Sequence, residues 1–225
     1  MIRLLSYADL LSIINALLGF LAILVLFVDS LEMRIHISLS LILLGLVIDG
    51  LDGIVARKFG SSKLGEYLES MADMTTLSIA PAVFVFHVYL EAVSGDVYRY
   101  IYLLLALAIF LSFAIIRLAS FHIMKEDKFF IGLPASASTV ILLTLAYFEV
   151  DFILILPAVV IIGAFMASDV RFPKPGLKIN AFATLFILLT IIFNKDYYGF
   201  APLLLFAGIL IYAIGGPIYL KFFKK

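Results

Sequence analysis

The chain has 225 residues, of which 64% are hydrophobic and 14% charged, and its mean hydropathy is +1.19. Ordinary globular domains are about 45–50% apolar and about 25% charged, so this composition excludes a soluble domain, a disordered chain and a nucleic-acid-binding protein. The sixteen basic and sixteen acidic residues cancel, and the absence of Cys excludes disulfides, thiol nucleophiles and thiolate metal sites.

Long apolar stretches follow one another along the whole chain. A bilayer core of about 30 Å needs about 20 apolar residues per helix, and we predict about eight spans, of which the fifth and sixth are short enough to form one re-entrant hairpin instead. The chain is therefore expected to be an all-α, polytopic integral membrane helix bundle with one domain, residues 1–225. The predicted spans are residues 8–28, 35–57, 64–90, 97–123, 135–149, 152–168, 178–194 and 199–220.

The basic residues indicate how the bundle is oriented. With a cytoplasmic N-terminus and eight spans, all of the sixteen Lys and Arg residues except Arg34, Arg99 and Lys195 lie at the cytoplasmic side. Cytoplasmic loops are enriched in Lys and Arg, so both termini are expected in the cytoplasm, with the protein in the cell membrane.

Five acidic residues lie within the second and third predicted spans, in their cytoplasmic halves. An ionised side chain near the middle of a span costs at least about 2.5–3.5 kcal/mol, so these carboxylates require a compensating cation. Helical spacing puts Asp49 and Asp52 on one face of the second span, and Glu69 and Asp73 on one face of the third. The fifth acidic residue is Glu66.

The short turn at 58–63 makes these two helices antiparallel neighbours, so that their acidic faces can meet. Oxygen ligands without His or Cys suit Mg²⁺ or Mn²⁺, with Ca²⁺ as a further choice. Two ions are expected, because four carboxylates around one divalent ion would be overcharged. Because the carboxylates lie in the cytoplasmic halves of the two spans, the active site is expected on the cytoplasmic side.

Small residues accompany the carboxylates. Gly53, Ala56 and Gly65 either allow close helix packing or leave room for a ligand and its phosphates to approach the backbone. Arg57 either faces a diphosphate or marks the membrane boundary by extending its side chain to the interface.

The pattern Asp49-x2-Asp52-Gly53-x2-Ala56-Arg57-x7-Gly65-x3-Glu69-x3-Asp73 closely resembles the signature of the CDP-alcohol phosphotransferase family. Glu69 stands where the family has its third aspartate, and the spacing of seven residues before Gly65 is often eight in members. Five further segments look like blocks of the phosphatidylserine synthase branch, although this branch more often has Arg and Asn where the chain has Ser120 and His122. These segments are Asn15–Phe20, Ser78–Ala82, Arg117–His122, Phe130–Pro134 and Arg171–Lys174.

The resemblance implies transfer of a phosphatidyl-type group from a CDP-linked lipid to an alcohol, with release of CMP. It implies that Asp73 is the general base, that five residues bind CDP and that four carboxylates hold two divalent ions. It also implies that the protein forms a homodimer. The CDP-binding residues are Asp52, Gly53, Ala56, Arg57 and Gly65, and the metal ligands are Asp49, Asp52, Glu69 and Asp73.

The acceptor in this branch is serine, whose carboxylate needs a cation. Arg117 is the first candidate, with an interfacial anchor as its alternative role. The turn at Gly132 and Pro134 either shapes the acceptor pocket or begins the fifth helix. His122 and Lys125 are the remaining acceptor candidates, each with an interfacial role as the alternative.

Three other functions compete with serine transfer. The same reaction with glycerol phosphate or inositol phosphate would require a denser basic pocket. An intramembrane prenyltransferase also uses aspartate pairs, but it does not require the small residues and Arg57 between them. A cation transporter would carry acidic residues deeper in spans five to eight, where the sequence has none comparable.

Overall fold

The computed structural model describes residues 4–60, 62–121, 123–124, 126 and 129–223, with the side chains of Tyr197 and Phe223 left out. Each predicted span coincides with a helix, or with the continuous run α3–η2–α4, which confirms the all-α polytopic fold. The elements are α1 Tyr7–Leu26, α2 Arg34–Phe59, α3 Gly65–Asp73, the π-helix η2 Met74–Ile79, α4 Ala80–Val88, α5 Val97–Phe121, β1 Phe129–Ile131, α6 Ala135–Tyr147, α7 Phe152–Met166, β2 Arg171–Pro173, α8 Leu177–Phe193 and α9 Asp196–Phe223.

The helices differ in whether they are long enough to cross a bilayer. In the described part of the chain, five helical runs are long and apolar enough, namely α1, α2, α3–η2–α4, α5 and most of α9. The helices α6, α7 and α8 have 13, 15 and 17 residues. At 1.5 Å per residue, α6 is only about 20 Å long, which is shorter than the bilayer core of about 30 Å. The count of eight spans therefore stays a prediction.

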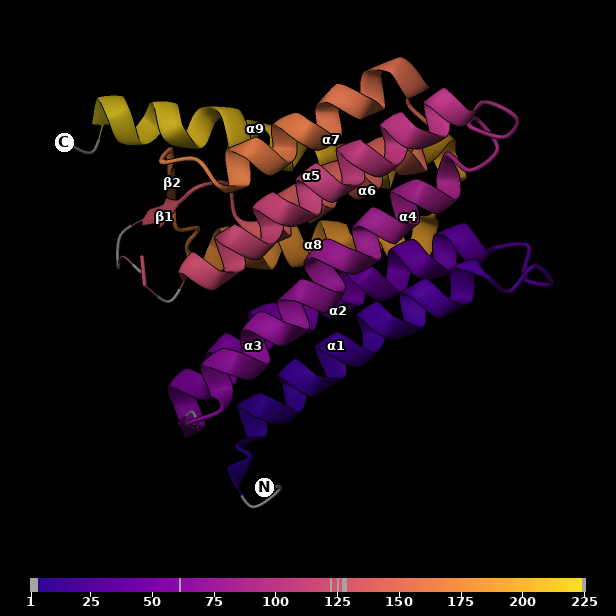
Figure 1. Cartoon of the computed structure of the whole chain (residues 1–225). Helices are drawn as coiled ribbons and strands as arrows, with labels where there is room; N and C mark the ends of the chain where they lie inside the picture. Colours follow the sequence, from indigo (N-terminus) through magenta and orange to yellow (C-terminus); the bar gives the residue numbers. More distant parts are fainter. Residues whose placement is uncertain (1–3, 61, 122, 125, 127–128, 224–225) are drawn as a thin grey trace.

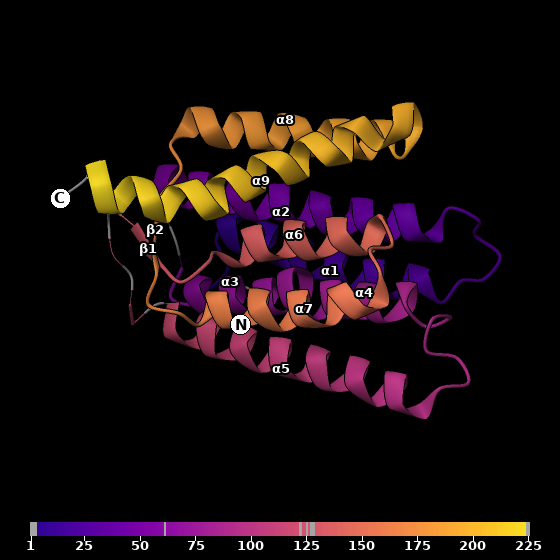
Figure 2. The ribbon, with the colours of Figure 1, turned by 90° about the horizontal axis from the view of Figure 1, so that it is seen from above.

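The helices run roughly side by side, and the start of α1 and the end of α9 lie toward the same end of the bundle (Figure 1). The turn between α2 and α3 and the pair β1–β2 lie toward this end as well. Figure 2 shows α6 in the middle of the bundle, between α5 on one side and α8 on the other, and its side chains are buried along most of its length. This arrangement agrees with an even number of passes, and the cytoplasmic assignment of this end stays a prediction.

The three basic residues expected on the other side of the membrane all form ion pairs. Arg99 Nε lies 3.4 Å from Asp96 Oδ2, and Lys195 Nζ lies 3.4 Å from Glu149 Oε1. Arg34 pairs with Asp29 in the loop between α1 and α2. Each of these three positive charges therefore has an acidic partner at this end of the bundle.

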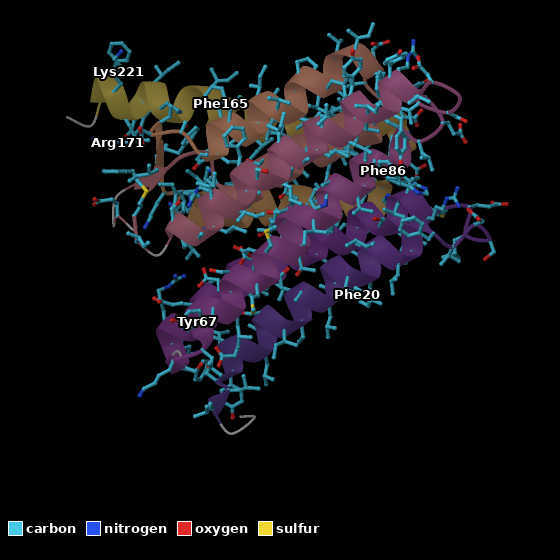
Figure 3. All side chains as sticks on the ribbon, in the orientation of Figure 1. Phe20, Tyr67, Phe86, Phe165, Arg171 and Lys221 are labelled. Atoms are coloured by element: carbon cyan, nitrogen blue, oxygen red, sulfur yellow. The ribbon has the colours of Figure 1, made fainter. Side chains whose placement is uncertain are left out.

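Large apolar side chains cover the outside of the bundle (Figure 3). Phe20, Tyr67 and Phe165 are 51%, 71% and 47% exposed, and many more large apolar residues are exposed along the helices. Such extensive apolar surface is not tolerated by monomeric soluble proteins, whereas lipid tails solvate it well. The protein is therefore an integral membrane protein.

A π-helix interrupts the third helical run directly after Asp73. Pro81, the second residue of α4, has no backbone N–H, so the carbonyl of Leu77 loses the donor that a regular α-helix would supply. Thr139 Oγ1 of α6 donates a hydrogen bond to this carbonyl at 2.6 Å. Because lipid offers no replacement donor, this contact satisfies the interrupted backbone and fixes α6 against the segment that follows Asp73.

Candidate active site

The carboxylates predicted from the two signature helices meet where α2 and α3 face each other. The side chains of Asp49 of α2 and Asp73 of α3 lie next to each other. Asp52 and Glu69 lie close enough to interact electrostatically with both. The exposed Glu66 belongs to the same helix as Glu69 but does not line the cavity beside the cluster.

This cavity has a volume of about 180 Å³. Three of the carboxylates line it, together with Arg117 from α5 and the start of α6. Asp52 does not line it and instead accepts a hydrogen bond from Ser12. The lining residues are Asp49, Glu69, Ser70, Asp73, Leu77, Arg117, Leu118, Phe121, Phe130, Pro134, Ala135 and Ser136.

Arg117 is the cation of this cavity and is held in an unusual environment. Its side chain is 7% exposed, its guanidinium lies 5.1 Å from the centre of the Phe121 ring, and Asp73 and Tyr212 are within electrostatic range. Its Nε is buried and has no hydrogen-bond partner among the described residues. Arg117 lines the cavity and forms no ion pair among the described residues, so its buried positive charge favours an anionic ligand there.

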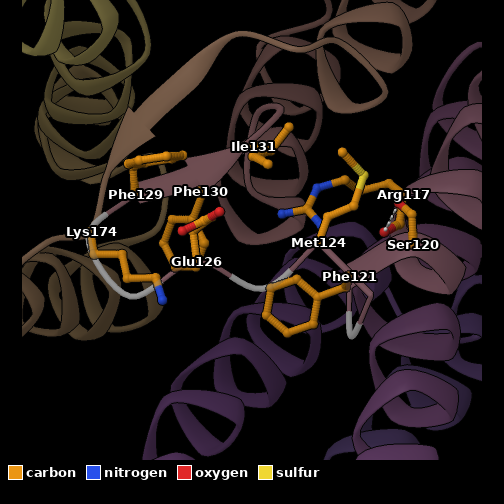
Figure 4. Close-up of a pocket in the computed structure, with 9 residues that line it drawn as sticks. All are labelled: Arg117, Ser120, Phe121, Met124, Glu126, Phe129, Phe130, Ile131 and Lys174. Carbon is orange, nitrogen blue, oxygen red and sulfur yellow. Dashed lines mark hydrogen bonds between the residues drawn. The ribbon is translucent and has the colours of Figure 1, made fainter.

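A second, much smaller cavity of about 20 Å³, with room for about one water molecule, adjoins the first and shares Arg117, Phe121 and Phe130 with it. Figure 4 shows Arg117 and Ser120 on one side of this second cavity and Phe129 and Lys174 on the other. The Lys174 Nζ lies 5.2 Å from the centre of the Phe130 ring. Arg117 therefore borders both cavities near the end of α5.

The strand β1 lines the second cavity, and Lys174, which also lines it, directly follows β2; the sequence did not predict either strand. They pair antiparallel, with Phe130 opposite Phe172. The pairing places the segments Phe130–Pro134 and Arg171–Lys174, which resemble blocks of the same branch, beside each other. Each strand has three residues, which is too short to leave a recognisable alternating pattern.

Gly132 and Pro134 have different environments. Gly132 adopts a φ of 77°, and a Cβ there would lie 2.1 Å from the carbonyl oxygen of Met166, so this glycine is required for the turn to pack on α7. Pro134 is the N-cap of α6 and lines the larger cavity. The remaining acceptor candidates, His122 and Lys125, lie outside the described residues.

The predicted CDP-binding residues belong to α2 and to the start of α3 and lie outside both cavities. The exposed Arg57 folds back toward Gly53, where a Cβ would lie 3.5 Å from Arg57 Nη1 and no other atom would be within 4 Å. Neither of the two cavities is lined by Gly53, Ala56, Arg57 or Gly65. The glycine face of α2 is therefore open to an approaching ligand.

The donor set fits a divalent cation in its chemistry. All four side chains offer carboxylate oxygens, which hard cations such as Mg²⁺ and Mn²⁺ prefer. Asp49 and Asp73 lie next to each other with Asp52 and Glu69 close by, so a cation would offset the repulsion between these carboxylates. Among the described residues, however, no three acidic or His side chains are placed to hold a metal together. Binding by three or four of these carboxylates therefore requires side-chain rotation.

Two polar residues of α1 that the sequence did not single out contact the cluster. Ser12 Oγ donates to Asp52 Oδ2 at 2.8 Å, and Asn15 Nδ2 lies 3.5 Å from Asp73 Oδ1. Their spacing, with Gly19 one turn further on, places all three on one face of the first span. A polar face in an apolar helix was the available signal.

A carboxylate cluster inside a membrane helix bundle, beside a buried arginine and an open glycine face, defines an integral membrane enzyme for anionic substrates. The sequence profile of the CDP-alcohol phosphatidyltransferase family matches residues 5–215. The chain belongs to this family, and it is a membrane transferase of phospholipid biosynthesis.

Individual relatives are similar over most of the chain. The CDP-diacylglycerol–serine O-phosphatidyltransferase of Methanocaldococcus jannaschii is 29% identical over 95% of this chain and 97% of its own length. The archaetidylserine synthase of Methanothermobacter thermautotrophicus is 32% identical over 74% of this chain and 69% of its own. A CDP-diacylglycerol–serine O-phosphatidyltransferase of Helicobacter pylori is 31% identical over 80% and 79%.

Proposed function

We propose that the protein transfers the phosphatidyl-type group of a CDP-linked lipid to the hydroxyl of serine and releases CMP. The observation that carries the proposal is the cavity in which Asp49 and Asp73 lie opposite Arg117, whose buried Nε has no partner among the described residues. Carboxylates beside a cation suit an acceptor that carries both a hydroxyl and a carboxylate. The names of the relatives from three organisms support the same acceptor.

In this proposal the serine hydroxyl oxygen attacks the lipid-side phosphorus of the donor. The new P–O bond forms as the bond to CMP breaks, CMP leaves with the electron pair, and Asp73 accepts the hydroxyl proton. Arg117 binds the serine carboxylate by a charge-assisted hydrogen bond, which turns the hydroxyl toward Asp73. A direct displacement of this kind depends on positioning and on charge neutralisation more than on a covalent nucleophile.

The donor is proposed to lie along the open face of α2. Gly53, Ala56 and Gly65 allow its phosphates to approach the helices, and Arg57 contacts the diphosphate. The carboxylate cluster would hold two Mg²⁺ or Mn²⁺ ions, and Ca²⁺ is a further cation that could bind there. The cluster consists of Asp49, Asp52, Glu69 and Asp73. When bound, these ions would neutralise the diphosphate and the charge that develops on CMP.

Purified protein in detergent tests this proposal with a CDP-lipid, Mn²⁺ or Mg²⁺, and one acceptor at a time. We expect CMP release with serine, and little with glycerol 3-phosphate or inositol phosphate, because the larger cavity holds one arginine and no lysine. EDTA should abolish the release. Faster release with a phosphorylated acceptor would refute serine as the acceptor, and activity that persists in EDTA would refute the metal requirement.

The orientation and assembly are part of the proposal. We infer that the active site opens to the cytoplasm of the cell, since Lys58 and Lys174 lie at the same end of the bundle as the carboxylates. We also infer that the protein is a homodimer, as its family resemblance implies. Because the chain has no Cys, Lys58→Cys and Glu149→Cys are clean single probes. An impermeant maleimide added to intact cells should label Glu149→Cys and spare Lys58→Cys; the reverse would refute the orientation. Cross-linking in native membranes should give a dimer.

A further inference from the structure

The first helix connects the two helices that carry the carboxylates. Within the described residues, α1 packs extensively against α2 and also against α3 and η2, whereas α2 and α3 make little direct contact. The short turn between α2 and α3 therefore makes them consecutive in the chain without packing their backbones together. The relative position of their carboxylates depends on α1.

Ser12 is the contact of α1 with the α2 carboxylates. Its side chain is 4% exposed and donates from Oγ to Asp52 Oδ2 at 2.8 Å, while the carbonyl oxygen of Ala8 is farther away, at 3.4 Å. A hydroxyl has one proton to donate, and the shorter contact to a carboxylate is the stronger bond. Asp52 is itself 6% exposed, so this bond restrains a buried carboxylate.

Asn15 is the contact of α1 with the α3 carboxylates. It is fully buried, and its Nδ2 lies 3.5 Å from Asp73 Oδ1. The reversed amide would place two acceptor oxygens against each other, so the amino group faces the carboxylate. The backbone carbonyl oxygen of Asn15 accepts a hydrogen bond from Thr76 Oγ1 at 2.7 Å, which fixes α1 to the π-helix after Asp73.

Two glycines make this close approach possible. A Cβ on Gly19 would lie 2.4 Å from Thr76 Oγ1 and 2.7 Å from Thr76 Cα. A Cβ on Gly45 would lie 2.5 Å from Thr76 Cγ2 and 2.8 Å from Asn15 Oδ1. Neither space tolerates a methyl group, so α1 and α2 are shaped to admit Thr76 and Asn15 together.

We propose that Ser12 and Asn15 are positioning residues, which hold Asp52 and Asp73 in the orientation that cation binding and proton transfer require. The inference rests on the proposed function and assigns α1 a role in the reaction beyond helix packing. Groups that orient metal-binding carboxylates typically change metal affinity or activity by about 10- to 100-fold when removed.

Ser12→Ala and Ser112→Ala form a matched pair. Ser112 Oγ donates to the carbonyl of Ala108, four residues earlier on α5, at 2.8 Å, so its removal deletes a serine hydroxyl from a helix without touching a carboxylate. Mn²⁺ binding to the substrate-free protein, measured by electron paramagnetic resonance, is the first readout. We expect Ser12→Ala to weaken Mn²⁺ binding by about 10-fold or more, and Ser112→Ala to leave it unchanged.

Conservative variants separate positioning from packing. Ser12→Thr retains the hydroxyl and should restore Mn²⁺ binding and kcat. Ser12→Cys has a similar volume but only a weak donor, so it should resemble Ser12→Ala. It replaces the alanine variant if that variant does not fold. Asn15→Ala should lower kcat by about 10-fold while the serine KM stays unchanged. The exposed Asn180 on α8 supplies the control Asn180→Ala.

The inference would be overturned if Ser12→Ala and Ser112→Ala had the same Mn²⁺ affinity and the same kcat. It would also be overturned if Ser12→Ala lowered Tm but left Mn²⁺ affinity and kcat unchanged. Failure of the proposed function is separable from this result. Wild-type protein that releases no CMP with any acceptor refutes the function, whereas the Mn²⁺ comparison between the two serine variants still decides the role of Ser12.

Discussion

Replacement of Arg117 by Met asks whether a buried guanidinium recognises the carboxylate of the acceptor. Arg117 is 7% exposed, borders both cavities and has a buried Nε without a partner among the described residues. A hydrogen bond to a charged group contributes about 1.5–3 kcal/mol, and each 1.4 kcal/mol is tenfold in affinity. The serine KM should therefore rise about 10- to 150-fold.

The assay is CMP release with serine varied at saturating CDP-lipid, and then with CDP-lipid varied at saturating serine. The CDP-lipid KM should change by less than about threefold, because the donor is proposed to lie along α2, outside the cavity that Arg117 lines. Arg117→Lys keeps the charge but loses the fixed fork of donors, so it should recover only part of the serine affinity.

Arg171→Met is the matched control, because Arg171 is exposed and stacks on Phe129, 4.7 Å from the ring centre, at the same end of the bundle. It should leave both KM values unchanged. An Arg117→Met variant with normal serine KM would refute carboxylate recognition, and a selective rise in the CDP-lipid KM would reassign Arg117 to the donor.

Three further substitutions test other parts of the account. Glu69→Asp shortens a cavity carboxylate to the family's aspartate and should keep kcat within about threefold; a loss above tenfold would show that the longer side chain is required. Gly132→Ala, at a φ of 77° with Met166 O 2.1 Å from the added Cβ, should lower stability by at least about 1–2 kcal/mol, seen as a lower Tm in detergent. Thr139→Val removes the donor to the Leu77 carbonyl and should lower stability by about 0.6–1.7 kcal/mol, again seen as a lower Tm in detergent. An unchanged Tm would contradict the strain argued for Gly132→Ala or the hydrogen bond argued for Thr139→Val.

The helices were predictable because lipid requires long apolar runs. The predicted span 97–123 and α5, Val97–Phe121, begin at the same residue, and the third span predicted the continuous run that ends at Val88. The π-helix inside that run was not predictable from hydropathy, because it depends on Pro81 and on a donor that α6 supplies. The strands β1 and β2 were missed for a related reason, since their pairing joins short segments far apart in the sequence.

The carboxylates were predictable because acidic residues at helical spacing within a span demand a partner. Their mutual arrangement was only partly predictable. The short turn suggested that α2 and α3 pack directly, yet α1 makes the closer contacts with both, within the described residues. Ser12 and Asn15 attract little attention as single polar residues, and their significance appears when Asp52 and Asp73 are seen beside them.

The central claim is that serine is joined to the lipid phosphate by the carboxylate cluster. Purified protein supplied with CDP-lipid, Mn²⁺ and labelled serine tests it, with CMP and labelled lipid measured in the same sample. Wild-type protein should form one labelled lipid for each CMP, Asp73→Asn should form neither, and Glu66→Gln, at the exposed acidic residue of the same helix, should behave as wild type. CMP released without label in the lipid, or labelled lipid formed by Asp73→Asn at the wild-type rate, would contradict the account.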